Sequence, residues 1–153
     1  VGVTPMASIL AHVLQTGGTS GSGPQRVIFV WSFRDRGVLY WCKDLLERAA
    51  QLPWVQLHLH HTRATALSAP SAMDEHVVVS GRPDLDVIVD AAIGRSRVDV
   101  GFTDAAIVPR SRIDSSNSRV AVLTCGPASM VDAVRSIVDR NPVCHLHEET
   151  FEL

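Results

Sequence analysis

Arg26–Ser32, with the sequence RVIFVWS, opens the part of the chain that decides the fold. This short and almost wholly apolar run is typical of a strand that is covered on both faces of a sheet. Residues 38–51 follow with apolar side chains at helical spacing and charged side chains on the opposite face. Residues 55–61 (VQLHLHH) then alternate in the manner of a strand. Strand, helix and strand in this order predict a parallel pair, because parallel neighbours need a crossover connection.

The same alternation extends in both directions along the chain. Upstream, the pattern predicts a helix that ends at about Thr16 and then a flexible Gly- and Ser-rich loop. Downstream, residues 63–75 have the composition of a loop, and the remaining segments are predicted as strand 76–80, helix 84–94, strand 119–125, helix 128–139 and strand 143–147. These segments predict an α/β fold with a doubly wound, mostly parallel sheet, in which ligands bind at the carboxyl ends of the strands.

Length and composition narrow the class of protein. The 153 residues are enough for one domain, and 46% hydrophobic with 20% charged residues fits a packed globular domain. A net charge of −2 argues against a nucleic-acid partner, because the chain has no basic excess to neutralise phosphates. No apolar run approaches the ~20 residues of a membrane span. The three cysteines are odd in number and far apart, which favours a reducing compartment over a disulfide framework.

The first residues, Val1-Gly2-Val3-Thr4-Pro5, have the composition of a turn that places a phosphate at a helix start. Thr4 suits the N-cap, and Pro5 suits the first helical position. Gly2 allows the backbone to approach a ligand, and a helix start offers free N–H groups to an anion. The alternative is an ordinary capped helix without a ligand.

Residues that could bind a ligand follow three of the predicted strands. They are Ser32-Phe33-Arg34, Gly81-Arg82-Pro83 and Cys125-Gly126-Pro127. A guanidinium such as that of Arg34 can pair with a phosphate, although a solvated loop arginine is the simpler alternative. It is the clustering at one edge of the sheet that indicates a ligand site, since no single turn is specific enough.

Taken in order, five motifs resemble the NADPH-binding domain of the ferric reductase and NADPH oxidase family, within the ferredoxin–NADP reductase superfamily. The motifs are VGVTP at residues 1–5, Arg34 after the VIFVWS strand, GRPDL at 81–85, LTCGP at 123–127 and HEETF at 147–151. The acidic-then-Phe end is more similar to the metalloreductase branch. Glu152 and Leu153 follow Phe151 and depart slightly from the usual aromatic ending.

The resemblance implies a role for each motif. Gly2, Val3, Thr4 and Pro5 are expected to hold the pyrophosphate of NADPH, and Ser32 and Arg34 its 2′-phosphorylated ribose. Gly81, Arg82 and Pro83 are expected to contact the adenine side or a phosphate. Cys125, Gly126 and Pro127 are expected to position the nicotinamide, and Phe151 to cover the flavin ring. For Cys125 the alternative is an inert buried thiol, and for Phe151 a hydrophobic plug.

Two aromatic residues near Arg34 are further candidates. Tyr40 and Phe33 are both candidates for stacking on the adenine, and core or helix packing is the equally expected alternative for each.

The resemblance also implies the function. Residues 1–153 are expected to be the NADPH-binding domain of a flavin-dependent ferric-chelate reductase, which passes hydride from NADPH to FAD and single electrons through haem to ferric iron. The flavin and the haem would be held by other domains, and the chain would lie on the cytoplasmic side of a membrane. The alternatives are a superoxide-producing NADPH oxidase and a non-catalytic nucleotide-binding module.

The chain begins where a buried central strand is expected to have ended already. We therefore expect a domain that is incomplete at its N-terminus, lacks the first strand of its sheet, and is poorly stable and inactive alone.

The histidines suggest a different hypothesis. His58, His60 and His61 lie on one predicted strand, and Cys144, His145 and His147 on another. Imidazole and thiolate groups suit zinc or copper. The spacing matches no closed ligand pattern, and the two strands are expected on opposite sides of the sheet centre. Ordinary surface histidines are therefore the preferred interpretation, and no metal site is predicted.

Overall fold

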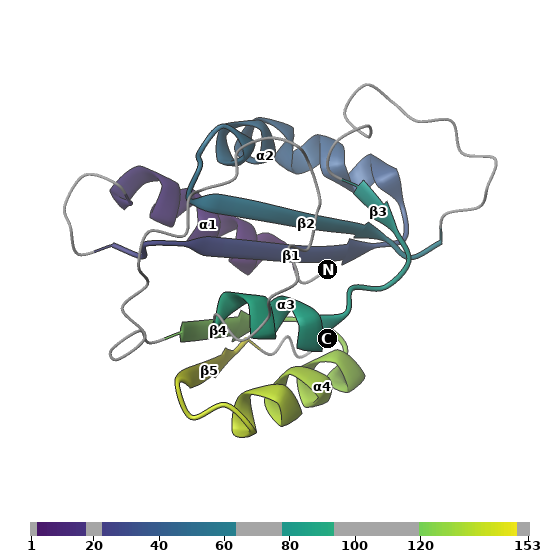
Figure 1. The fold of residues 1–153 in the computed structure, drawn as a ribbon. Coiled ribbons are helices and arrows are strands. Elements are labelled where there is room, and N and C mark those ends of the chain that lie inside the picture. Colours follow the sequence, from purple (N-terminus) through teal and green to yellow (C-terminus); the bar gives the residue numbers. More distant parts are fainter. Residues whose placement is uncertain (1–2, 18–22, 64–77, 94–119, 150–153) are drawn as a thin grey trace. The chain divides into compact units, whose positions relative to one another are not determined.

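The computed structural model describes residues 3–17, 23–63, 78–93 and 120–149 (Figure 1). Among these the chain forms a mixed α/β structure whose strands are all paired in parallel, in one three-stranded and one two-stranded sheet. The parallel α/β class predicted from the sequence is therefore confirmed. The described residues divide into two compact units: 10–17, 23–63 and 78–83 in the first, and 3–9, 84–93 and 120–149 in the second.

The first unit contains the three-stranded sheet, in the order β1-β2-β3. Its elements are β1 (Val27–Phe33), the 3₁₀-helix η1 (Arg36–Cys42), α2 (Lys43–Ala50), β2 (Val55–His61) and β3 (Val78–Ser80). The register pairs Phe33 of β1 with His61 of β2, and His61 with Ser80 of β3. The last residues of all three strands thus lie in one row, from which the following turns leave the sheet.

One face of this sheet carries the core of the first unit. Successive strand residues point to opposite faces, so Phe33, Leu59 and His61 share a face. Phe33 and Leu59 pack against Leu39 of η1 and Leu46 of α2. A second cluster joins strand residues to α2 and to α1 (Val3–Thr16), through its buried members Leu10, Ala49 and Val55. Figure 1 shows α1 and α2 beside the same sheet.

The second unit contains the two-stranded sheet. Its elements are α3 (Leu85–Ala92), β4 (Val120–Thr124), α4 (Ala128–Asp139) and β5 (Cys144–Glu148). Val134 and Val138 of α4 pack with Cys144 of β5, and apolar residues of α3 complete the cluster. Surface ion pairs join the same elements: Arg140, which caps the end of α4, binds Asp86 of α3, and Arg135 of α4 binds Glu148 of β5.

Several element bounds shift by one or two residues from the sequence prediction, and at two helix starts, those of η1 and α1, the shift changes which residues cap the helix. The helix expected at 38–51 begins as a 3₁₀-helix at Arg36, because the carboxylate of Asp35 accepts a hydrogen bond from the Gly37 N–H and caps it there. Helix α1 begins at Val3, so Thr4 and Pro5 lie inside its first turn and not at the N-cap and first position. Pro5 is still tolerated, because first-turn N–H groups have no helical partner.

Candidate functional site

The turn after β1 presents the guanidinium of Arg34. We call residues Arg34–Gly37 the arginine turn. Arg34 is exposed, and it directly follows Phe33, which is only 5% exposed and belongs to the core. The neighbouring carboxylate does not pair with Arg34 in the described contacts, because Asp35 Oδ1 lies 2.8 Å from the Gly37 nitrogen and caps η1. The arginine turn therefore presents the positive charge of Arg34 beside the Asp35 carboxylate, which is already engaged as the cap of η1.

The end of β2 fastens the arginine turn. The Thr62 N–H and its hydroxyl both donate to the carbonyl of Phe33, at 2.8 and 3.1 Å. The Nε2 atom of His61 lies 3.1 Å from the carbonyl oxygen of Arg34, and Nε of Arg36 donates to Nδ1 of the same ring at 3.4 Å. The His61 ring also stacks on Phe33, with 5.7 Å between the ring centroids. Sequence analysis did not single out His61 or Thr62 for this site.

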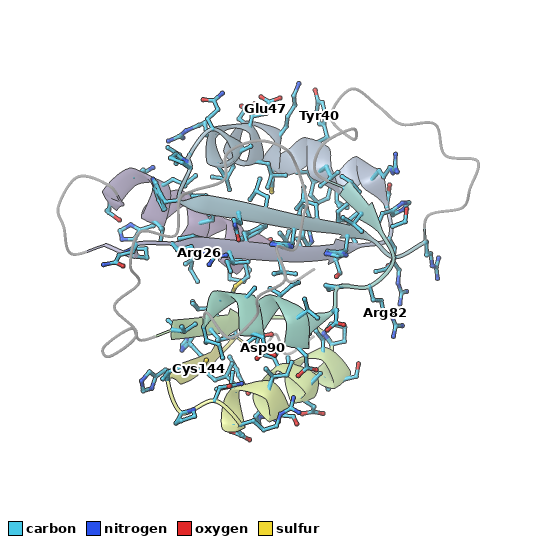
Figure 2. The ribbon with its side chains drawn as sticks, viewed as in Figure 1. Arg26, Tyr40, Glu47, Arg82, Asp90 and Cys144 are labelled. Carbon is cyan, nitrogen blue, oxygen red and sulfur yellow. The ribbon has the colours of Figure 1, made fainter. Side chains whose placement is uncertain are left out.

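The turn after β3 comprises Gly81, Arg82 and Pro83, which we call the Gly-Arg-Pro turn. Gly81 has a φ of +104°, and its N–H donates to the His61 carbonyl at 3.0 Å. Side chains other than glycine are strained in this region of φ, which explains the residue type. Arg82 is exposed, and Figure 2 shows it beyond the end of β3. The first unit thus brings together Ser32, Arg34 and the Gly-Arg-Pro turn at the carboxyl end of one sheet.

The turn after β4 contains Cys125, Gly126 and Pro127, which we call the thiol turn. Backbone bonds alone are described here: the Glu149 N–H donates to the Thr124 carbonyl at 2.9 Å, and the Pro127 carbonyl accepts from the N–H groups of Met130 and Val131 in α4. Pro127 takes the N-cap position of α4 without a side-chain cap. Burial, and secondarily the charge of Glu149, raises the pKa of Cys125, so its thiol is neutral at pH 7.

The remaining predicted residues are placed as follows. Val3, Thr4 and Pro5 lie in the first turn of α1, in the second unit together with the thiol turn. Gly2 and Phe151 lie outside the described residues. Phe33 is a core residue whose ring stacks on His61 and meets Trp31 edge to face, so it is not free to stack on an adenine. Tyr40 is 80% exposed, and Figure 2 shows it pointing away from the sheet.

Two of the β2 histidines, His60 and His61, are buried and not surface residues, which corrects that expectation for them. His60 and His61 are each 6% exposed, although they point to opposite faces of the sheet. Both ring nitrogens of His60 lack a hydrogen-bond partner in the described part of the chain. Burial lowers the pKa of His60, and the Gly81 backbone nearby opposes this more weakly without making a bond of good geometry. On β5, by contrast, His145 and His147 are exposed as predicted.

Burial also lowers the pKa of His58, with smaller contributions from His60 and Arg26. His58 and His60 therefore favour the neutral state, which is also the state that binds metals. No three His, Cys, Asp or Glu side chains gather into a possible metal site within the described segments. Strands β2 and β5 belong to different sheets.

The described helices include none with the length and apolar character that crossing a membrane requires.

The parallel α/β fold, with glycine-containing turns and an exposed arginine at strand ends, defines a nucleotide-binding class of domain. The comparison with family models then gives the family: the model of the ferric reductase NAD binding domain matches residues 1–139, and the chain belongs to this family. Neither the curated proteins nor the solved structures give a match. Family membership supports a nicotinamide-nucleotide-binding role within an oxidoreductase.

Proposed function

We propose that this chain is the NADPH-binding part of a flavin-dependent ferric-chelate reductase. The observation that carries the choice of NADPH over NADH is the exposed guanidinium of Arg34 at the carboxyl end of β1. A carboxylate at this place in a dinucleotide-binding sheet binds the ribose 2′-hydroxyl of NAD, whereas an arginine accommodates the 2′-phosphate of NADP. Asp35 does not take the NAD role, because its carboxylate caps η1.

The residues of the first unit bind the adenosine half of the nucleotide in this proposal. Arg34 pairs with the 2′-phosphate, and a guanidinium can do so with two parallel hydrogen bonds. Gly81 has open space where a side chain would stand, so the backbone of the Gly-Arg-Pro turn can approach the ligand. Arg82 adds a second exposed positive charge at the same end of the sheet. Ser32 supplies a hydroxyl within β1.

The thiol turn orients the nicotinamide half in this proposal. Cys125 contributes a small side chain, and its raised pKa keeps it an uncharged thiol beside a planar ring. When bound, NADPH would supply the hydride for FAD, and in this proposal the electrons would go on singly through haem to ferric iron. The residues of this chain need no general acid or base for that transfer, since their part is orientation and exclusion of water. Val3, Thr4 and Pro5, with Gly2, hold the pyrophosphate at the start of α1, and Phe151 covers the flavin.

The proposal places FAD mainly in another domain of the same protein and haem in a membrane domain, with residues 1–153 on the cytoplasmic side. A superoxide-producing oxidase would use the same residues for NADPH, and only the final acceptor would differ. A non-catalytic nucleotide-binding module would also keep Arg34 but would not need the small thiol at Cys125.

Nucleotide selectivity tests the proposal. In Arg34→Ala, NADPH binding should weaken by roughly 10- to 100-fold, because a charge-assisted hydrogen bond is lost. NADH binding should change less than about twofold, since NADH has no 2′-phosphate for the arginine to pair with. Titration of nucleotide fluorescence measures both, and Arg48→Ala on the exposed side of α2 serves as the matched arginine control. Equal losses for the two nucleotides would show that Arg34 does not bind the 2′-phosphate.

A second measurement separates the enzyme from the binding module. The chain joined to a flavin domain of the same family should reduce a ferric chelate with NADPH. If NADPH binds to that protein and its flavin stays oxidised, the reductase hypothesis is wrong and the module hypothesis gains support.

A further inference from the structure

We propose that His61 is the positioning residue that fixes the selectivity for NADPH, because it joins the arginine turn and the Gly-Arg-Pro turn to each other. The inference rests on the proposed role of Arg34. His61 ends β2, the middle strand of the three-stranded sheet, with β1 on one side and β3 on the other. It is therefore the residue from which both turns can be reached.

The ring of His61 holds the arginine turn. A guanidinium can only donate, so the bond from Arg36 Nε to Nδ1, at 3.4 Å, makes Nδ1 the acceptor. A neutral imidazole then carries its proton on Nε2, which donates to the Arg34 carbonyl at 3.1 Å. The ring thus binds the residues on either side of Asp35.

The main chain of His61 holds the other turn. Its carbonyl accepts the hydrogen bond of the Gly81 N–H at 3.0 Å, directly before Arg82. One buried residue therefore bonds to the Arg34 backbone through its ring and to the Gly81 backbone through its carbonyl. Because Arg34 and Arg82 are both exposed and no side-chain hydrogen bond of either is among the described contacts, the backbone of the two turns is what holds these residues in place.

The His61 ring is itself held firmly. It is 6% exposed and stacks on Phe33 with an angle of 20° between the ring planes. Phe33 precedes Arg34 and packs against Leu39, Leu46 and Leu59. A ring fixed by the core can hold a surface turn in one place, which lowers the cost of ordering Arg34 when an anion binds.

Three variants at position 61 separate the contributions of ring stacking, of the Nε2 donor and of the Nδ1 acceptor. His61→Phe keeps an aromatic ring on Phe33 but removes both polar atoms. His61→Gln can keep a donor near the place of Nε2, and His61→Asn can keep an acceptor near that of Nδ1. His60→Phe is the matched control, since that neighbouring ring is equally buried, points to the opposite face and makes no hydrogen bond with the described residues.

The readout is the ratio of NADPH to NADH affinity. His61→Phe should lower this ratio roughly tenfold, the size of effect expected from losing hydrogen bonds that orient a charged group. His61→Gln should recover part of the ratio, because it restores the bond to the Arg34 carbonyl, and His61→Asn should recover less. His60→Phe should leave the ratio unchanged. In the Arg34→Ala background, His61→Phe should have no further effect on the ratio.

The outcomes distinguish this inference from the function on which it rests. If Arg34→Ala changes the ratio and His61→Phe does not, His61 is not the positioning residue and the proposed function stands. If His61→Phe and His60→Phe lower the affinity for both nucleotides alike, the effect is one of packing and the inference is wrong. If Arg34→Ala leaves the ratio unchanged, the role of Arg34 fails and the inference fails with it.

Discussion

The carboxyl ends of the two sheets are built differently. At the end of the three-stranded sheet, the buried ring of His61 binds the Arg34 carbonyl, and the half-buried hydroxyl of Thr62 binds the Phe33 carbonyl just before the arginine turn. At the end of the two-stranded sheet, backbone bonds alone are described around the thiol turn, and the nearby charged groups lie at the surface. A turn that must aim a long charged side chain gains from such anchoring. A turn that offers a small thiol to a planar ring needs little more than the direction of its strand.

The two turn glycines give the largest expected difference between these ends. In Gly81→Ala, a φ of +104° places a methyl group in a strained region, so the free energy of unfolding should fall by about 1–3 kcal/mol. In Gly126→Ala, the new methyl group meets only the flexible end of the Met130 side chain, so the loss should stay below about 1 kcal/mol. Urea unfolding of both variants measures the difference.

Equal losses in the two glycine variants would contradict this account of the two turns. The affinities of Gly81→Ala for NADPH and for inorganic phosphate can also be compared. A lower affinity for NADPH alone would show that the geometry of the Gly-Arg-Pro turn matters for binding the nucleotide.

The sequence predicted the elements well because their apolar periods are clear. Residues 55–61 were predicted as a strand and 128–139 as a helix, and β2 and α4 have those bounds. The 3₁₀ start at Arg36 was missed because the capping bond of Asp35 depends on a local turn that period alone does not show. Among the described residues the strands pair in two sheets, a grouping that local sequence pattern does not show because strand pairing depends on tertiary contacts.

The sequence predicted which turns carry charged and small residues, but not what holds them. His61 was grouped with the surface histidines, although its alternation with Leu57 and Leu59 was a signal that it lies on the covered face. The hydrogen bonds of its ring could not be foreseen, because they join residues far apart in the sequence. The roles of the exposed arginines stay predictions until binding is measured.

The next largest expected difference between the two sheets is the effect of their histidines on the unfolding free energy, and this effect depends on pH. Burial lowers the pKa of His60 below its usual value of 6.5, so between the two values the unfolded chain binds a proton that the folded chain does not. The contribution of His60 to the unfolding free energy is therefore fully present above pH 6.5 and is lost as the pH falls from 6.5 toward the lowered pKa of the folded chain. His60→Leu should remove this part of the loss, and it should raise stability at pH 7.5 by about 1 kcal/mol because an unpaired buried polar group disappears.

His145→Leu is the matched control on the two-stranded sheet, since that side chain is exposed. Its unfolding free energy between pH 7.5 and 5.5 provides the comparison for the loss of an exposed histidine. If the unfolding free energy falls equally steeply with decreasing pH in His60→Leu and in the unchanged chain, then His60 does not take up a proton when the chain unfolds.

The smallest expected effect concerns the thiol turn. The charge of Glu149 contributes, after burial, to the raised pKa of Cys125. Glu149→Gln should therefore lower that pKa and raise the rate of Cys125 alkylation by iodoacetamide at pH 7.5 by about twofold, because the thiolate is the reacting form. Cys42 provides an internal reference, since burial alone raises its pKa, and its rate should not change. A parallel rise at both cysteines would indicate loosening of the whole chain. A rise at Cys125 alone would show that surface charge, and not a buried bond, tunes the thiol turn.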